Sequence, residues 1–179
     1  MKNNGISSFD ESVVDPGFSI LRLKNDSEEV LNKKYPVSLE FIQFHFCLKG
    51  QTNFTFNEGN YTFQVLEDHS MLLYNPQKSL PIEVELAPDT WMVSVLISIT
   101  KFHSLFSSDA DHISFLSPDN NSKKYYDNLP FSSSIAVVLS QILQAKVHDS
   151  MKSLYFKGKV YELLCCLLYT SDAADDLRG

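Results

Sequence analysis

The stretch from Leu39 to Pro76 most constrains the fold, because strand-like runs alternate with turn signals along it at short spacing. Leu39–Leu48 is rich in aromatic and apolar residues, and Thr52–Phe56 places aromatic side chains at alternate positions. After the turn residues 57–60, Tyr61–Val65 repeats that alternation. Side chains of a strand point to opposite faces at period two. Short antiparallel strands joined by tight loops therefore predict a β-sandwich or small barrel rather than a parallel sheet.

The rest of the chain predicts further strands, separated by polar connections. The expected strands are Phe18–Lys24, Met71–Tyr74, an edge strand over Leu80–Ala87 and a central strand over Trp91–Ile99. Three segments are expected to lack regular structure: a loose lead-in over Met1–Asp15, a loop over Asn25–Tyr35 and a polar segment over Asp109–Asn128 that includes a surface loop at Pro118–Asn121.

Helical spacing appears in the second half of the chain. Thr100 is expected to cap a short helix over Lys101–Phe106. Ile135–Leu143 has apolar residues at i, i+3, i+4, i+7 and i+8, with serines before it as cap candidates. A second helix is expected over Met151–Leu168, although Gly158 inside it costs about 1 kcal/mol relative to alanine. The sequence therefore predicts an α+β fold, a β body followed by two amphipathic helices.

Composition excludes several classes of protein. The chain has 179 residues, a hydrophobic content of 44% and a formal net charge of −7, which indicates a packed domain. Binding to phosphates needs clustered Lys and Arg, and the sequence has no such cluster. No signal-like segment or bilayer-length apolar run appears, and three cysteines do not suggest a disulfide framework. We therefore expect a cytoplasmic location and no membrane contact.

Several strings in this order resemble the sensor half of AraC-family transcription regulators, particularly those of the Bacteroidetes type. The strings are FIQFHFCLKG, LLYNPQ, LPIEVEL, ISITKFHSLF and SLYFKGKVYELL, and the resemblance covers residues 18–168. It implies a cupin-like antiparallel β-barrel of the jelly-roll type, followed by helices that mediate dimerisation. In the family a separate C-terminal half with two helix-turn-helix units binds DNA.

Compared with the family that it resembles, this chain is expected to differ at its C-terminal end. The helix-turn-helix half is absent, and the segment YTSDAADDLRG has no relation to the preceding periodicity. We expect a barrel over residues 1–110, a loop and helical dimerisation region over 111–168, and a non-native or disordered tail over 169–179. DNA is expected as a partner only through the missing half.

His45 raises the question of a metal site, because cupin enzymes bind a metal through strand histidines and a carboxylate. One histidine is too few, since catalytic metals usually have three protein ligands. The other histidines, at turns, the short helix or loops, have no fitting spacing. We therefore expect no metal, no cofactor and no catalytic residues, and a hydrogen-bonded histidine that lines the barrel.

The first long strand has one mixed face and one apolar face. Phe41, Gln43, His45 and Cys47 lie on the mixed face. Ligand pockets are mostly apolar with a few placed polar groups, so we expect this face to look into the barrel and contact a small-molecule effector. The alternative is that both faces are simply packed, with the polar groups bonded internally. Trp91 is either a further pocket wall or part of the core.

The last helix has an apolar stripe longer than a single packing contact needs. Its candidate contacts for a homodimer are Val160, Leu163, Leu164 and Leu167. The alternative is an intramolecular hairpin with Ile135–Leu143.

The preferred function is the effector-sensing and dimerisation domain of a transcription regulator, truncated before its DNA-binding domain. The other hypotheses are a stand-alone small-molecule-binding cupin without catalytic activity and a cupin enzyme, which the missing ligand set disfavours.

Overall fold

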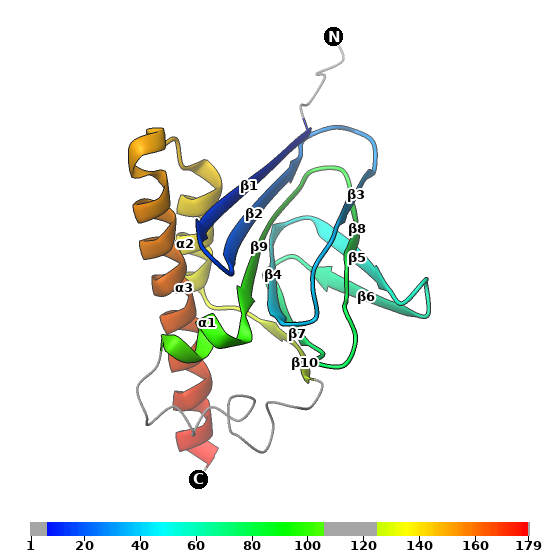
Figure 1. Ribbon diagram of the computed structural model, residues 1–179. Helices are drawn as coiled ribbons and strands as arrows, with labels where there is room; N and C mark the ends of the chain where they lie inside the picture. Colours follow the sequence, from blue (N-terminus) through cyan, green and yellow to red (C-terminus); the bar gives the residue numbers. More distant parts are fainter. Residues whose placement is uncertain (1–6, 106–124, 179) are drawn as a thin grey trace.

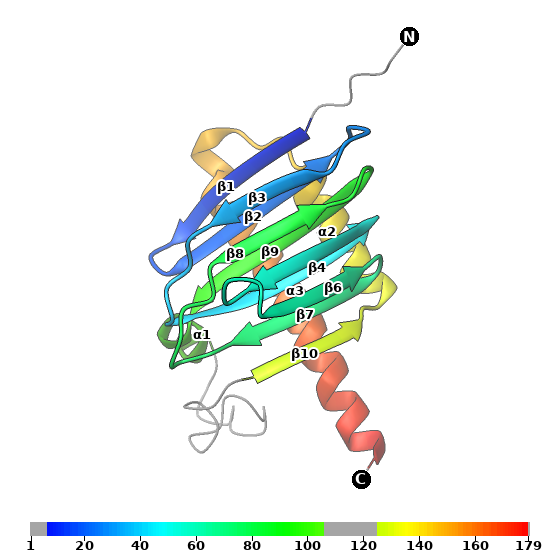
Figure 2. The ribbon, with the colours of Figure 1, turned by 90° about the vertical axis from the view of Figure 1, so that its right-hand side faces the viewer.

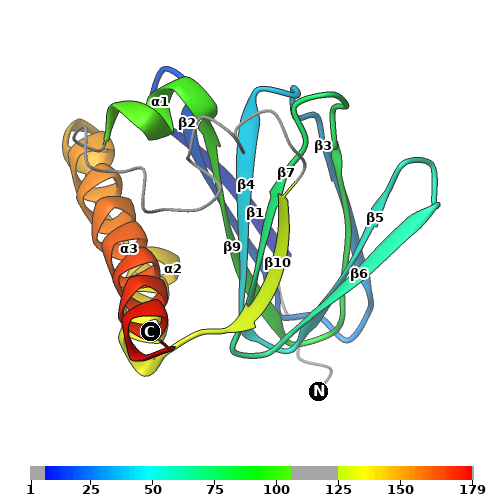
Figure 3. The same ribbon diagram turned by 90° about the horizontal axis from the view of Figure 1, so that it is seen from below.

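Two antiparallel sheets and a pair of helices form three layers. The computed structural model describes residues 7–105 and 125–178. The six-stranded sheet has the order β1-β2-β9-β4-β7-β10 and lies between the helices and the four-stranded sheet, of order β3-β8-β5-β6 (Figures 1 and 3). The strands are β1 (Ser7–Asp15), β2 (Phe18–Asn25), β3 (Leu31–Tyr35), β4 (Phe41–Lys49), β5 (Gln51–Phe56), β6 (Tyr61–Leu66), β7 (His69–Tyr74), β8 (Ile82–Leu86), β9 (Thr90–Ser98) and β10 (Tyr125–Pro130).

Alternation along the central strands divides the core in two. On β4, Ile42, Phe44 and Phe46 pack toward the helices, together with alternate residues of β2 and β9. The opposite faces pack between the sheets in a second cluster that contains Cys47 and Phe54. Both faces of the central sheet are thus covered, as its near-continuous burial requires.

The described residues form three helices: α1 (Ile99–Ser104) follows β9, and α2 (Ser133–Gln144) and α3 (Asp149–Arg178) follow β10. Ser98 and Ser132 cap α1 and α2, since each hydroxyl accepts a hydrogen bond from a backbone N–H in the first turn. Helix α3 lies alongside α2 on the outer face of the six-stranded sheet (Figure 1). Its buried residues are Phe156, Val160, Leu163 and Leu164.

At both open edges of the sandwich, side-chain contacts rather than backbone strand pairing join the two sheets in the described part of the chain. At one edge the Phe9 ring of β1 lies 6.3 Å from the Tyr35 ring of β3, and the Tyr35 hydroxyl donates to the Glu11 carboxylate. At the other edge the Phe63 and Tyr126 rings of β6 and β10 lie 4.6 Å apart. Near that pair, the Asn128 amide donates to the Gln64 carbonyl oxygen at 3.3 Å. The sandwich is therefore held at both edges by side chains, which Figure 2 shows as neighbouring edge strands of the two sheets.

Strand β1 also fastens the helices to the sheet. The Asp15 carboxylate lies 2.8 Å from the ammonium groups of Lys101 and Lys157. These ammonium groups lower the pKa of Asp15 to about 2. The Arg22 guanidinium on β2 contacts the Asp10 carboxylate at 2.7 Å and donates to the Ile142 carbonyl oxygen at 3.2 Å. That carbonyl lies in the last turn of α2, where backbone acceptors lack helical partners.

The antiparallel body with two long helices confirms the predicted fold class, and three expected loops are wrong in part. Strand β1 occupies much of the expected lead-in Met1–Asp15, β3 lies inside the expected loop Asn25–Tyr35, and β10 begins inside the polar segment Asp109–Asn128. All three are edge strands with a polar face, which weakens the apolar alternation. The expected surface loop at Pro118–Asn121 lies outside the described residues.

Three smaller expectations also change. Ser98, not Thr100, caps α1. Strand β8 is not an edge strand, because β3 pairs with it on its outer side. Helix α3 continues beyond Leu168 to Arg178 and so includes most of the segment expected as a disordered tail. Whether that segment is native, and the division into residues 1–110, 111–168 and 169–179, stay predictions.

Candidate functional site

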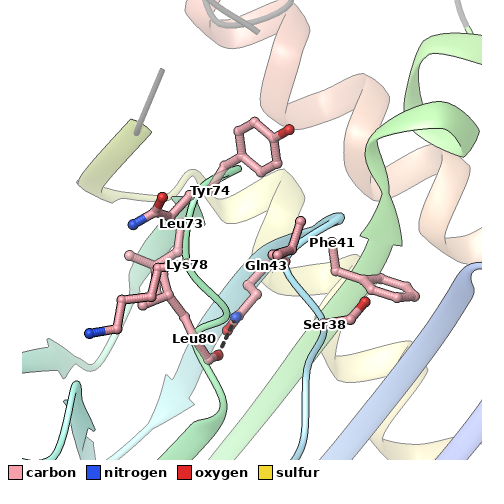
Figure 4. Close-up of a pocket in the computed structure, with 9 residues that line it drawn as sticks. Ser38, Phe41, Gln43, Leu73, Tyr74, Lys78 and Leu80 are labelled. Carbon is pink, nitrogen blue, oxygen red and sulfur yellow. Dashed lines mark hydrogen bonds between the residues drawn. The ribbon is translucent and has the colours of Figure 1, made fainter. Parts of the chain in front are cut away.

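A row of hydrogen bonds runs along the inner face of the six-stranded sheet and reaches Leu80, just before β8 of the other sheet. The Gln43 amide nitrogen donates to the Leu80 carbonyl oxygen at 2.7 Å, as Figure 4 shows. This contact fixes the orientation of the amide, so the Gln43 carbonyl oxygen faces His45 Nε2 at 2.9 Å. A carbonyl oxygen only accepts, so Nε2 carries the proton. His45 Nδ1 then accepts from the Ser94 hydroxyl at 2.6 Å.

Burial keeps His45 neutral. Its side chain is completely buried, and burial lowers the pKa of the imidazole to about 3. Both ring nitrogens have hydrogen-bond partners, so neither offers a free lone pair to a metal in this arrangement. The described residues contain no cluster of three His, Cys, Asp or Glu side chains suited to a metal ion. The expected absence of a metal stays a prediction.

The β5–β6 hairpin diverges from β7 and β10, as Figure 3 shows. Two neighbouring hollows lie between these elements, next to the hydrogen-bonded residues. The smaller one reaches Phe41 and Gln43. The larger one, the outer cleft, has a volume of about 370 Å³, within the range of small-molecule sites. The residues that line both hollows are Leu73, Tyr74, Asn75, Lys78 and Leu80. The outer cleft is also lined by Phe56, Asn57, Tyr61, Phe63 and Tyr126.

Aromatic rings lead from the buried histidine to the outer cleft. The His45 ring lies 4.5 Å from the Phe54 ring, and Phe54 lies 6.1 Å from Phe56. Phe56 in turn lies 5.9 Å from Phe63, whose ring contacts Tyr126. The outer cleft is therefore the exposed end of a packed aromatic row. Tyr74 differs, since its side chain packs in the helix-facing cluster and its ring turns away from Gln43 in Figure 4.

The structure brings together only some of the predicted pocket residues. Phe41 and Gln43 line the smaller hollow, while His45 and Cys47 lie deeper and are buried. Burial raises the pKa of the Cys47 thiol to about 12, so this side chain is an uncharged packing group. Trp91 lies on the other face of the sheet, where its indole N–H donates to Asp26 at 2.7 Å, so it does not line the cleft.

Sequence reasoning missed the charged residue and one wall of the outer cleft. Tyr61 and Phe63 were visible as alternating positions of one strand, but nothing marked them as a pocket wall. Tyr126 lies within the segment expected to be polar loop, and Lys78 lies in a connection without a recognisable pattern. Only the strand pairing of β10 with β7 places Tyr126 opposite Phe63.

The predicted dimer contacts are mostly occupied within the chain. Val160, Leu163 and Leu164 are buried against the sheet and α2, and Leu167 is partly buried. This packing corresponds to the intramolecular alternative.

Among the residues that the structure describes, none of the helices has the length and hydropathy of a membrane span.

Two antiparallel sheets followed by C-terminal helices make this a cupin-like β-sandwich. The family model of the regulatory protein PchR N-terminal domain matches residues 7–177. The chain therefore belongs to this family, the N-terminal domains of AraC-type regulators. No curated protein gives a match.

Solved structures similar to this chain include two cupin proteins and ToxT. An RmlC-like cupin protein from Desulfovibrio desulfuricans is 12% identical, with 51% of this chain and 81% of that chain covered and a TM-score of 0.39. The Cnp3 cupin domain of Schizosaccharomyces pombe is 12% identical, with 65% and 72% covered and a TM-score of 0.39. Wild-type ToxT from Vibrio cholerae with a bound unsaturated fatty acid is 11% identical, with 91% and 56% covered and a TM-score of 0.45. This chain thus spans little more than half of the ToxT structure.

Proposed function

We propose that this domain senses a small effector in the outer cleft and forms a homodimer, while DNA binding belongs to a separate domain of the regulator. Family membership supports the regulatory role. The observation that carries the sensing role is the position of the outer cleft between the edges of the two sheets, bounded by β6, β7 and β10. A ligand there would contact both sheets at once. It would therefore favour one arrangement of the sheets over others through differential affinity.

The proposal puts the ligand contacts in the outer cleft rather than at the centre of the sandwich, because the interior is packed. His45, Ser94 and Gln43 satisfy one another, so the centre is a rigid support. Phe41 and Gln43 remain candidate contacts through the smaller hollow. Because this support is fixed, the residues that line the outer cleft hold their positions before a ligand binds. This arrangement includes no catalytic step.

The homodimer in this proposal uses the exposed face of α3 rather than the buried stripe. Leu154 has 68% of its surface exposed, and Met151 and Cys165 are also exposed. A methyl group added at Gly158 would meet nothing within 4 Å. The packing of the chain on itself therefore does not need a glycine there, although glycine weakens a helix. Close approach of a second helix would give the small residue a role.

A thermal-shift screen with a varied small-molecule library tests the sensing role. We expect ligands that stabilise the wild type to lose most of their effect in Tyr61→Ser, which removes a wall of the outer cleft. The matched control is Leu66→Ser, because Leu66 is exposed on the opposite face of β6. A library without hits, or hits that are equally effective in both variants, would contradict the proposal.

A further inference from the structure

We infer that the outer cleft is built for a planar aromatic carboxylate, whose rings pack against the exposed aromatic side chains of β6 and β10 and whose charge is held by Lys78. This inference rests on the proposed function, because it names the ligand class of the same cleft. It is drawn from three features of the cleft: its exposed rings, its charge and its position between two edge strands.

The rings of the outer cleft present surface that the protein itself does not cover. Tyr61 and Tyr126 have 53% and 46% of their surface exposed, whereas Phe56 behind them is buried. Phe63 touches both the buried and the exposed part of the row, with ring centroids 5.9 Å from Phe56 and 4.6 Å from Tyr126. An additional flat ring would extend this row. Aromatic pairs attract each other beyond simple burial, so stacking favours an aromatic ligand over a saturated one.

The charge of the outer cleft indicates an anion. Lys78 is the charged member of the described lining, and no carboxylate is among the lining residues that the structure describes. The Lys78 ammonium donates to the side-chain carbonyl of Asn57, which is a neutral acceptor. In the described part of the chain, no carboxylate lies within salt-bridge distance of it, unlike Lys34 and Lys49. A lysine with a neutral neighbour retains its charge for a ligand, and a carboxylate is its ordinary partner.

The position of the outer cleft between two edge strands determines which shape of ligand fits it. The walls belong to edge strands of different sheets, joined there by the Phe63–Tyr126 contact and the Asn128–Gln64 hydrogen bond. A flat molecule can lie against these rings while its charged end reaches Lys78 on the β7–β8 connection. A volume of about 370 Å³ is near the lower end for ligand pockets, which favours a molecule of one to two rings.

Three related probes separate the contributions of ring and charge. The probes are naphthalene-2-carboxylate, its neutral carboxamide, and decahydronaphthalene-2-carboxylate, which keeps the charge but loses the flat aromatic rings. Calorimetric titration of the wild-type chain should show the aromatic acid binding about five- to tenfold tighter than either relative. Aromatic proton shifts in the spectra of Phe63 and Tyr126 would place the ligand in the outer cleft.

Two lysine variants complete the test. Lys78→Gln should lower the affinity for the aromatic acid to that for the carboxamide and leave carboxamide binding unchanged. Lys34→Gln is the matched control, because Lys34 is also exposed but lies on β3 beside Glu83. Equal binding of the saturated acid, an unaltered affinity in Lys78→Gln, or no binding of the aromatic acid at millimolar concentration would overturn the inference. A library hit of another class that is lost in Tyr61→Ser would then keep the sensing function and reject only this ligand class.

Discussion

Single residues at the barrel centre make the domain sensitive to acid. The folded protein binds a proton at His45 only near pH 3, whereas the unfolded chain does so near the ordinary pKa of 6.5. Between these values the unfolded state holds more protons, so stability falls as the pH is lowered. The limiting slope for one such group is about 1.4 kcal/mol per pH unit. Urea unfolding of the wild type between pH 7 and 4.5 should show this loss.

The control for this prediction is His45→Gln, whose amide does not titrate. Its free energy of unfolding should be lower than that of the wild type at pH 7, yet vary less between pH 7 and 4.5. Asp15 does not interfere, because its lowered pKa shifts its contribution to a window below pH 4. Parallel pH profiles of the two proteins would show that His45 becomes protonated without unfolding.

Gln43 is expected to be a structural residue as well as a neighbour of the smaller hollow. Gln43→Leu would leave the Leu80 carbonyl and the His45 N–H without partners in a buried region. Unsatisfied buried polar groups cost about 1–3 kcal/mol each, so we expect a loss of roughly 2–4 kcal/mol in chemical denaturation. Gln64→Leu on exposed β6 is the matched control and should change stability by less than about 0.5 kcal/mol. Similar losses in both variants would contradict the role assigned to Gln43.

At the scale of elements, Arg22 connects the end of α2 to the sheet. Its guanidinium donates hydrogen bonds at once to the Asp10 carboxylate and to the carbonyl oxygens of Ile142 and Ala145. A side chain of another shape cannot make all three contacts. We expect Arg22→Met to destabilise the domain by about 2–3 kcal/mol and to speed hydrogen exchange in the last turn of α2. Lys24→Met on the same strand is the control, with its cation above Trp91 rather than at a helix end. Unchanged exchange in Arg22→Met would exclude this connection.

The elements also show how far the sequence predicts the fold. Strands β2 and β4–β9 could be located, because apolar residues alternate or run continuously where both faces are covered. Strands β1, β3 and β10 could not, since their stability comes from pairing partners and from contacts such as Phe9–Tyr35 across the sandwich. Tertiary partners of this kind leave little periodicity in the local sequence.

The same limit applies to the candidate site. The inward face of β4 could be predicted from its alternation, so Phe41 and Gln43 were found. The outer cleft forms where β6 and β10, distant in sequence, lie close together. Neither Lys78 nor Tyr126 has a local signal that identifies it, because their proximity depends on the strand order. The alternation of side chains along a single strand therefore predicts which residues face the interior of the sandwich, but not which residues line the outer cleft.

At the scale of the whole molecule, the layers assign different faces to sensing and to assembly. The outer cleft lies between the sheets, and the exposed face of α3 lies on the far side of the central sheet (Figure 3). At the edge opposite the outer cleft, β1 contacts both the second sheet and α3: Phe9 and Glu11 contact Tyr35 of β3, while Asp10 and Asp15 contact lysines of α3. A change in the spacing of the sheets at that edge would therefore act on the contacts of α3.

The assembly proposal has a test that distinguishes the exposed face of α3 from general surface hydrophobicity. Sedimentation velocity of the wild type should show a concentration-dependent dimer, and Leu154→Lys should shift it toward monomer by at least tenfold in dissociation constant, because the charge would be buried in the interface. Val137→Lys is the matched control, since Val137 on α2 is similarly exposed at 57% but lies outside that face. Equal weakening in both variants would indicate nonspecific association. A wild type that stays monomeric at all concentrations would remove dimerisation from the role of this domain, while ligand sensing in the outer cleft would remain testable on the monomer.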